Sequence, residues 1–409
     1  MSIVFRAHDP RITRLTVPLY SHVAAKEFVL LYPVYALLFA EHGLSVSQIG
    51  SLLALWSGIG LVSGVPAGAL ADVIPRRYVL AVAPLLTAAA FSLWLLTPGY
   101  ASFATGFALW GVSGSLTSGA MEALIHDELA HRGAVDRYAR VMGVTRALEV
   151  GAVGAATLAA VPVLAWTADG SAGGFAAIGA MSVATCLLSA VAAFALPENR
   201  SAAMDSDTGG TPGYLATLRA GVAEARNNRP ARRAIILLVA LTSFWGVLDE
   251  YVPLLVADHG VATETIPLVL AVVWAGATVG GLCAGALGRL PDIGFAGLLA
   301  AGGVCLATGA MLGGVAGWVL LGLAFGVCQA ADVVADARLQ DRISGPSRAT
   351  VTSLAGFGAD AAATAAYPAV AAAVSVTSYG VAFAMFAAPY LVVAGVLVAA
   401  SRRPRRYLA

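Results

Sequence analysis

The sequence predicts an all-α membrane protein of twelve transmembrane helices, arranged as two parallel pseudo-repeats of six helices each, and three observations support this prediction. The apolar residue types make up 59% of the 409 residues, whereas the charged types make up only 11%. Long apolar runs recur along the chain, and its second half partly repeats its first half. Soluble domains carry about 25% charged residues, so lipid must be the solvent for most of this chain. An ordinary soluble enzyme, a nucleic-acid-binding protein and a disordered scaffold are therefore excluded.

A helix needs about 20 mostly apolar residues to cross a bilayer, and twelve such runs are present. The break between the ninth and tenth runs depends on Gly313 and Gly314. The first six runs lie near residues 15–40, 48–71, 78–97, 101–123, 139–165 and 174–196. The second six lie near residues 233–257, 266–288, 295–314, 317–337, 349–373 and 380–400.

A polar segment, residues 197–232, separates the two sets of runs. Its first part has the composition of a disordered linker, and its second part is compatible with a short amphipathic helix at the membrane surface. We therefore expect an N-terminal six-helix bundle at 1–196, a cytoplasmic linker at 197–232 and a C-terminal six-helix bundle at 233–409.

The distribution of basic residues predicts the orientation of the chain. Of the 24 Lys and Arg residues, 22 fall in the N-terminal segment, alternate loops, the linker or the C-terminal segment. The two exceptions, Lys26 and Arg146, lie inside predicted spans. Loops rich in Lys and Arg remain in the cytoplasm. We therefore place both termini in the cytoplasm. We also expect a multi-pass monomer in the bacterial inner membrane.

An internal duplication relates the two halves. Residues 36–70 match residues 253–287 at a constant offset, so that the pair His42 and Gly43 recurs as His259 and Gly260. Parallel repeats of this kind place a binding site near the middle of the membrane, between the two halves.

A short motif follows the second apolar run, where residues 68–77 read GALADVIPRR. It resembles the cytoplasmic loop signature of the major facilitator superfamily. Val73 replaces a basic residue of that signature and Pro75 replaces a glycine. Residues 33–70 and 122–127 are similar to the bacterial drug-efflux-like branch of the same superfamily.

The resemblance implies the fold of that superfamily, in which helices 1, 4, 7 and 10 line a central cavity and helices 2, 5, 8 and 11 flank it. It also implies that Gly68, Asp72, Arg76 and Arg77 form a conformational latch that stabilises the outward-facing state. The alternative is that these charges only set the topology of the loop.

Charged residues inside the predicted spans are candidates for substrate or proton binding. A charge at the centre of a bilayer costs at least about 2.5–3.5 kcal/mol, so it is retained for a reason. According to the resemblance, all of these residues fall on helices that line or flank the central cavity. The candidates are Lys26, Glu27, Arg146, Glu149, Asp249, Glu250, Asp332 and Asp360.

Several of these charges have structural alternatives. Arg146 and Glu149 are three residues apart on a predicted helix, a spacing that permits an ion pair. Arg146 also corresponds to Asp360 when the two halves are aligned, so these two residues are alternatively expected to pair across the pseudo-two-fold axis or to bind an ionic substrate. Glu27 is the first candidate for a proton or for a substrate cation. Two further acids, Glu122 and Asp336, are expected to cap helix ends or to pair with Arg338 or Arg342.

Aromatic residues on the predicted lining helices are candidates for a flat apolar wall of the cavity, and packing is their alternative role. The candidates are Tyr32, Tyr35, Trp245 and Tyr251.

Together these features predict a secondary active transporter that exports a small amphipathic or cationic organic compound by alternating access, coupled to proton influx. A proton-coupled importer or uniporter of a sugar, amino acid or metabolite is the alternative, and a non-transporting membrane sensor is a further one. The sequence contains no phosphate-binding loop, zinc-ligand spacing, nucleophile elbow or dinucleotide fingerprint, so we expect no enzymatic activity, cofactor or metal. The expected partners are the substrate, protons and the lipid bilayer, without nucleic acid.

Overall fold

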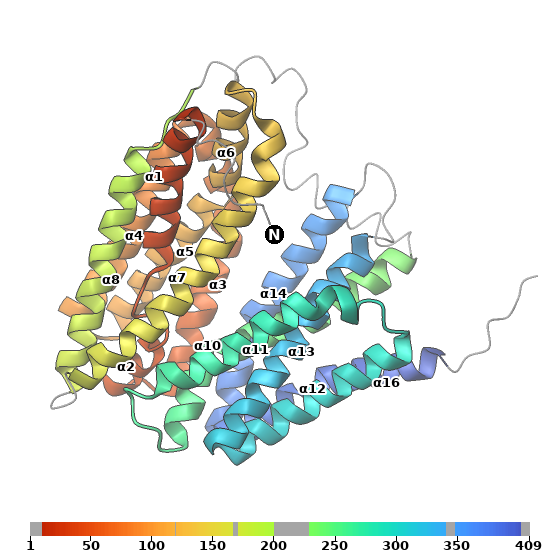
Figure 1. Ribbon diagram of the computed structural model, residues 1–409. Coiled ribbons are helices and arrows are strands. Elements are labelled where there is room, and N and C mark those ends of the chain that lie inside the picture. Colours follow the sequence, from red (N-terminus) through yellow and green to blue (C-terminus); the bar gives the residue numbers. More distant parts are fainter. Residues whose placement is uncertain (1–9, 119, 167–170, 200–228, 341–347, 402–409) are drawn as a thin grey trace, which may run out of the picture. The chain divides into compact units, whose positions relative to one another are not determined.

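The structure is a computed structural model that describes residues 10–118, 120–166, 171–199, 229–340 and 348–401. Every regular element in these ranges is a helix (Figure 1). The linker between the two predicted bundles lies largely outside the described residues.

The described residues fall into two compact units. The first unit lies within residues 1–42 and 55–211, and the second lies within residues 43–54 and 212–409. The helices that begin before residue 200 are α1 (Pro10–Glu27), α2 (Tyr35–Glu41), α3 (Val46–Val73), α4 (Arg76–Leu96), α5 (Tyr100–Thr117), α6 (Ala120–His131), η1 (Val135–Arg137), α7 (Tyr138–Trp166) and α8 (Ser171–Phe194). The later ones are α10 (Arg229–Asp258), α11 (Ile266–Leu287), α12 (Asp292–Leu312), α13 (Gly314–Gln340), α14 (Arg348–Val376), α15 (Tyr379–Phe386) and α16 (Ala388–Ser401).

Ten helical segments in the described ranges are long and apolar enough to cross a membrane. The first and fourth predicted spans are not among them, and each is divided between two helices. The fourth is split into α5 and α6 at Ser118, whose backbone is extended. The all-helical membrane architecture is therefore confirmed, whereas the count of twelve spans stays a prediction.

In the first predicted span, helix α1 ends at Glu27 and helix α2 begins at Tyr35. Pro33 lies in this break, and proline removes one helical hydrogen bond and clashes with the carbonyl four residues earlier. The backbone N–H of Leu31 donates instead to Oγ of Ser182 on α8, at 3.1 Å. This bond matters because a backbone group without a partner is costly in lipid.

The break predicted at Gly313 and Gly314 is present, since α12 ends at Leu312 and α13 begins at Gly314. Both glycines have positive φ angles, of 60° and 62°. This left-handed conformation is accessible to glycine at little cost, which explains why the chain can turn sharply between two long helices here.

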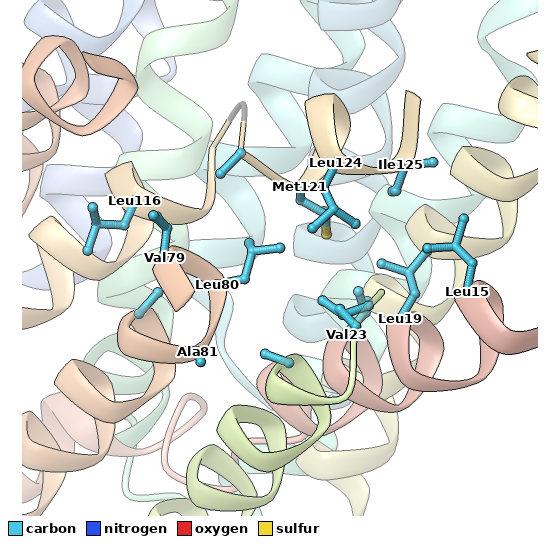
Figure 2. Packing of buried hydrophobic residues seen from close by; sticks show 14 of the residues in the cluster. Leu15, Leu19, Val23, Val79, Leu80, Ala81, Leu116, Met121, Leu124 and Ile125 are labelled. Atoms are coloured by element: carbon cyan, nitrogen blue, oxygen red, sulfur yellow. The ribbon is translucent and has the colours of Figure 1, made fainter. Parts of the chain in front are cut away.

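The first unit has an apolar core between α1, α4, α5 and α6 (Figure 2). Leu15 and Leu19 of α1 are fully buried there, as are Leu80 of α4 and Ile125 of α6. Helix α8 packs against both α1 and α4 (Figure 1). The core thus fixes α1 up to the turn that carries Lys26 and Glu27.

Glycines set the closest helix contact in the second unit. A Cβ atom placed on Gly276 of α11 would lie 2.0 Å from the carbonyl oxygen of Gly322 on α13. A Cβ atom on Gly280 would lie 1.9 Å from the carbonyl oxygen of Gly326. Small residues four apart let two backbones approach in this way inside a membrane. The two helices therefore depend on these glycines for their packing.

We predict that two adjacent substitutions on α11 differ in their effect on the unfolding temperature. Gly280→Ala should lower the unfolding temperature in detergent, because its Cβ atom would clash with the backbone of α13. Gly281→Ala is the matched control, since its Cβ atom would meet only the Gln329 side chain, at 3.5 Å. The control should be neutral or stabilising, because alanine is favoured over glycine in helices by about 1 kcal/mol. Equal unfolding temperatures for the two variants would contradict the proposed contact.

Candidate functional site

The first candidate charges lie where α1 ends. Nζ of Lys26 is 2.6 Å from Oε1 of Glu27, and the two side chains are 25% and 17% exposed. The helix stops directly after this pair, at the break before Pro33. The two charges therefore compensate each other at an interrupted point of the first span.

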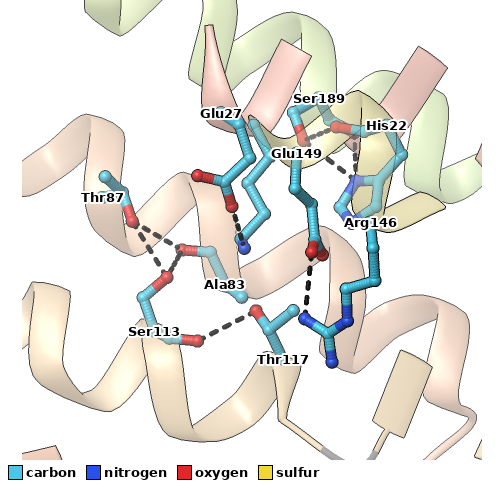
Figure 3. Close-up of polar contacts among 10 residues, drawn as sticks. His22, Glu27, Ala83, Thr87, Ser113, Thr117, Arg146, Glu149 and Ser189 are labelled. Carbon is cyan, nitrogen blue, oxygen red and sulfur yellow. Dashed lines mark hydrogen bonds and ion pairs between the residues drawn. The ribbon is translucent and has the colours of Figure 1, made fainter. Parts of the chain in front are cut away.

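A buried contact with α8 holds the helix turn that precedes this pair. His22 is fully buried, and its Nδ1 lies 2.9 Å from Oγ of Ser189 (Figure 3). The Ser189 hydroxyl also lies 3.0 Å from the main-chain oxygen of His22. Together with the bond between Leu31 and Ser182, these contacts attach the end of α1 and the break itself to α8.

Arg146 of α7 lies between two carboxylates. Its Nη1 is 2.9 Å from Glu149 on the same helix, and its Nη2 is 3.1 Å from Glu122 on α6 (Figure 3 shows the former contact). The ion pair that the sequence spacing allows is thus present. Glu122 pairs with this arginine rather than with Arg338, because α6 packs against α7 within the first unit.

The remaining expected pairs of the second unit differ from the prediction. Arg338 approaches Asp292 at 3.3 Å and covers the ring of Phe295, while Asp336 is exposed. Arg342 lies outside the described residues. The partner of Arg338 is therefore an acid on α12, which no local spacing could indicate.

Two acids of the second unit, Asp249 and Asp332, have neutral partners. The indole N–H of Trp274 on α11 lies 2.9 and 3.2 Å from the two carboxylate oxygens of Asp249 on α10. The hydroxyl of Thr242 donates to the carboxylate of Asp332 on α13.

Asp360 on α14 is exposed, and its carboxylate has no hydrogen bond or ion pair with another described residue. Glu250 is half-buried beside Asp249 in sequence. No Lys or Arg of residues 229–340 and 348–401 forms an ion pair with Asp249, Asp332 or Asp360. This set of three aspartates, which we call the acidic set, is the main electrostatic difference between the two units.

Two of the four predicted aromatic residues are part of the packed interior. Tyr35 is 4% exposed, and Tyr251 is fully buried with its hydroxyl donating to the main-chain oxygen of Tyr367 at 2.8 Å. Trp245 is half-buried, with its ring centroid 6.2 Å from that of Phe325. Tyr32 is also half-buried and stacks on Trp110, with ring centroids 5.4 Å apart.

Arg76 and Arg77 of the predicted latch contact acids of the first unit. Arg76 forms an ion pair with Asp127 of α6, and the side chain of Asp72 lies outside what the structure describes. The backbone N–H groups of Arg76 and Arg77 donate to the carboxylate of Glu198, at 2.7 and 3.2 Å. This carboxylate occupies the N-terminus of α4, where the helix dipole favours an anion.

The other two latch residues make different contacts. A Cβ atom on Gly68 would meet no described atom within 4 Å, so no described helix backbone lies close to this glycine. The Arg77 guanidinium lies 4.8 Å from the ring centroid of Tyr78.

Sequence reasoning missed the partners Asp127, Glu198, Trp274 and Thr242. Two of them carried a weak signal, because a tryptophan and a threonine within otherwise apolar spans need hydrogen-bond partners. Among the described residues, no group of His, Cys, Asp and Glu side chains is arranged to hold a metal ion.

Comparisons with known proteins agree with this architecture. Among solved structures, the chain is similar to the nucleoside transporter NupG, with a TM-score of 0.75, 12% identity, and coverage of 97% of this chain and 100% of that one. It is also similar to the xylose transporter XylE from E. coli, with a TM-score of 0.66, 15% identity, and coverage of 96% and 98%.

A third similar structure is the POT family transporter PepTSo, with a TM-score of 0.64, 11% identity, and coverage of 97% and 98%. No curated protein sequence matches the chain. The family model of the Major Facilitator Superfamily matches residues 23–331. The chain therefore belongs to the major facilitator superfamily.

Proposed function

We propose that this protein exports small amphipathic or cationic organic compounds in exchange for protons, by alternating access. The observation that carries the proposal is the acidic set, whose three carboxylates have no cationic side chain as a partner in the described part of the second unit. Family membership makes the protein a secondary transporter, and the acidic set gives it a preference for positively charged cargo.

The energetics of charges in membranes favour this assignment. An uncompensated carboxylate within a span costs at least about 2.5–3.5 kcal/mol, and either a proton or an organic cation removes most of that cost. A carboxylate that binds either a proton or an organic cation, but not both at once, couples the transport of one to the transport of the other. Competition of this kind is sufficient to drive exchange of the two cations across the membrane.

The charges of the first unit have a different role in this proposal. Lys26 and Glu27 compensate each other, and Arg146 is shared by Glu149 and Glu122. Acids with a built-in counter-ion have less need of a bound cation. We therefore assign these groups to holding helices in place beside the transport pathway.

The latch region contributes the conformational element of the proposal. Arg76 links α4 to α6, and Glu198 links the start of α4 to the chain that follows α8. Such charge-assisted contacts are strong enough to favour one conformational state and still break during a transport cycle. We retain both termini in the cytoplasm, an inner-membrane location, the drug-efflux-like branch and a monomer as parts of the proposal.

A proton-coupled importer is the second candidate function. NupG, XylE and PepTSo are named as nucleoside, xylose and peptide transporters, so similar folds also move polar metabolites. Protonation of an aspartate in the acidic set would serve symport equally well. The two candidates differ in the direction in which protons move relative to the substrate.

We predict that the direction of proton movement in proteoliposomes identifies the coupling. With pyranine trapped inside, ethidium added outside should make the lumen more alkaline, because each entering cation drives a proton outward. Uridine, D-xylose or dialanine should make the lumen more acidic only if the protein is a symporter. Asp249→Asn, Asp332→Asn and Asp360→Asn should each slow the response to ethidium about tenfold or more.

Asp292→Asn is the matched control for these variants, because Asp292 is a 64% exposed acid of the same unit outside the acidic set. Its response should equal that of the unmodified protein. Ethidium entry without any change in luminal pH would overturn proton coupling, and acidification by one of the polar metabolites would establish the importer instead.

We predict a structural rather than a coupling role for Arg146. Arg146→Gln should lower the unfolding temperature, because Glu122 and Glu149 then face each other without a counter-ion. The double variant Arg146→Gln/Glu149→Gln should recover part of the loss, since it removes one of the two like charges. An unchanged unfolding temperature in Arg146→Gln, combined with lost ethidium exchange, would instead assign the arginine to transport.

A further inference from the structure

Aromatic rings gather around the break in the first span. Five of them are fully buried, on helices α2, α4 and α5, and they form the interior of the cluster. These five are Phe39, Phe91, Trp94, Phe103 and Phe107. Three further rings at the edge of the cluster, Tyr32, Trp56 and Trp110, are only half-buried. We call these three residues the aromatic edge.

Two rings of the aromatic edge are stacked on each other, and the third is tilted against one of them. Tyr32 and Trp110 are nearly parallel, with an interplanar angle of 10° and centroids 5.4 Å apart. Trp56 lies 5.2 Å from Trp110 at 32°. Phe107 supports Trp110 from within the cluster, at 5.7 Å and 16°. Stacks of this kind present flat ring surfaces on which a further ring gains by stacking.

The backbone fixes the positions of these rings. A Cβ atom on Gly111 would lie 2.9 Å from the main-chain oxygen of Trp56, so this glycine brings α5 against α3. Tyr32 lies in the non-helical stretch that the Ser182 hydroxyl holds through Leu31. The aromatic edge is therefore preorganised, which lowers the entropic cost of binding a ligand.

Two indole N–H groups of the aromatic edge provide an independent sign of a ligand. Neither Trp56 nor Trp110 forms a hydrogen bond with another described residue. Trp94, inside the same cluster, donates to the main-chain oxygen of Phe103 at 3.2 Å. Donors without partners are unfavourable in a membrane span, so the two free N–H groups call for an acceptor from outside the described chain.

We propose that Tyr32, Trp56 and Trp110 bind a planar heterocyclic ring of the transported compound, stacking on its face and donating an indole hydrogen bond to an acceptor atom in the ring. The inference rests on the proposed function and narrows its substrate class. Cations without a ring are then poor substrates, and flat rings that carry a ring-nitrogen or ring-oxygen acceptor are good ones.

Three cations of equal charge test the proposal by isothermal titration of the purified protein. N-methyl-1,5-naphthyridinium is a flat ring with a free ring nitrogen, N-methylquinolinium is the same size without that nitrogen, and tetraethylammonium has no ring. The naphthyridinium should bind tightest and tetraethylammonium weakest. Trp110→Leu should weaken the two ring cations about fivefold or more, as removal of a stacking partner does, and leave tetraethylammonium unchanged.

Two further variants separate stacking from hydrogen bonding. Trp56→Phe and Trp110→Phe keep a ring but lose the indole N–H, so at least one should reduce the preference for naphthyridinium over quinolinium about threefold or more. Trp166→Leu is the control for loss of a tryptophan, because Trp166 is 89% exposed at the end of α7. It should bind all three cations as the unmodified protein does.

The outcomes distinguish this inference from the proposed function. If Asp249→Asn abolishes binding while Trp110→Leu leaves both ring cations unaffected, the acidic set is supported and the aromatic edge is overturned. If neither ring cation binds the unmodified protein at millimolar concentration, or if tetraethylammonium binds as tightly as they do, the ring proposal is wrong. Loss of ring binding in Trp110→Leu with an unchanged unfolding temperature supports it.

Discussion

The cost of placing charge and free hydrogen-bonding groups in lipid is the constraint on which this structure depends. The first unit meets it internally, because Lys26 compensates Glu27 and Arg146 compensates Glu149 and Glu122. In the described part of the second unit, two of the aspartates have only an indole and a hydroxyl as partners. Neutral donors stabilise a carboxylate but do not cancel its charge. Part of the negative charge of the acidic set is therefore left for a bound proton or cation to compensate.

The same constraint explains how the interrupted first span is tolerated. Its backbone leaves the helix after Glu27, and serines of α8 form hydrogen bonds with His22 before the break and with Leu31 within it. An interruption of this kind places main-chain groups, a charge pair and the aromatic edge in one short stretch. Transporters commonly build binding sites at discontinuous helices for this reason. Stability and a potential binding surface thus arise from the same local geometry.

Composition and motif were sufficient to predict the helical membrane fold and the family, because both depend on features that repeat along the chain. The turn at Gly313 was also predictable, since only glycine takes its φ angle at low cost. The pairing of Arg76 with Asp127 and of Asp249 with Trp274 was not, because these residues are far apart in sequence. The burial of Tyr35 and Tyr251 could not be predicted either, because a helix that is apolar on all sides has no periodic pattern that marks its inner face.

The most direct test of the central claim is the number of protons released when a cation binds. Titration calorimetry with ethidium, repeated in buffers of different ionisation enthalpy, measures this number for the purified protein. If the carboxylates of the acidic set exchange a proton for a cation, binding should release protons at pH values where these groups are protonated, and Asp249→Asn should release fewer. Binding that releases no protons at any pH would contradict the account.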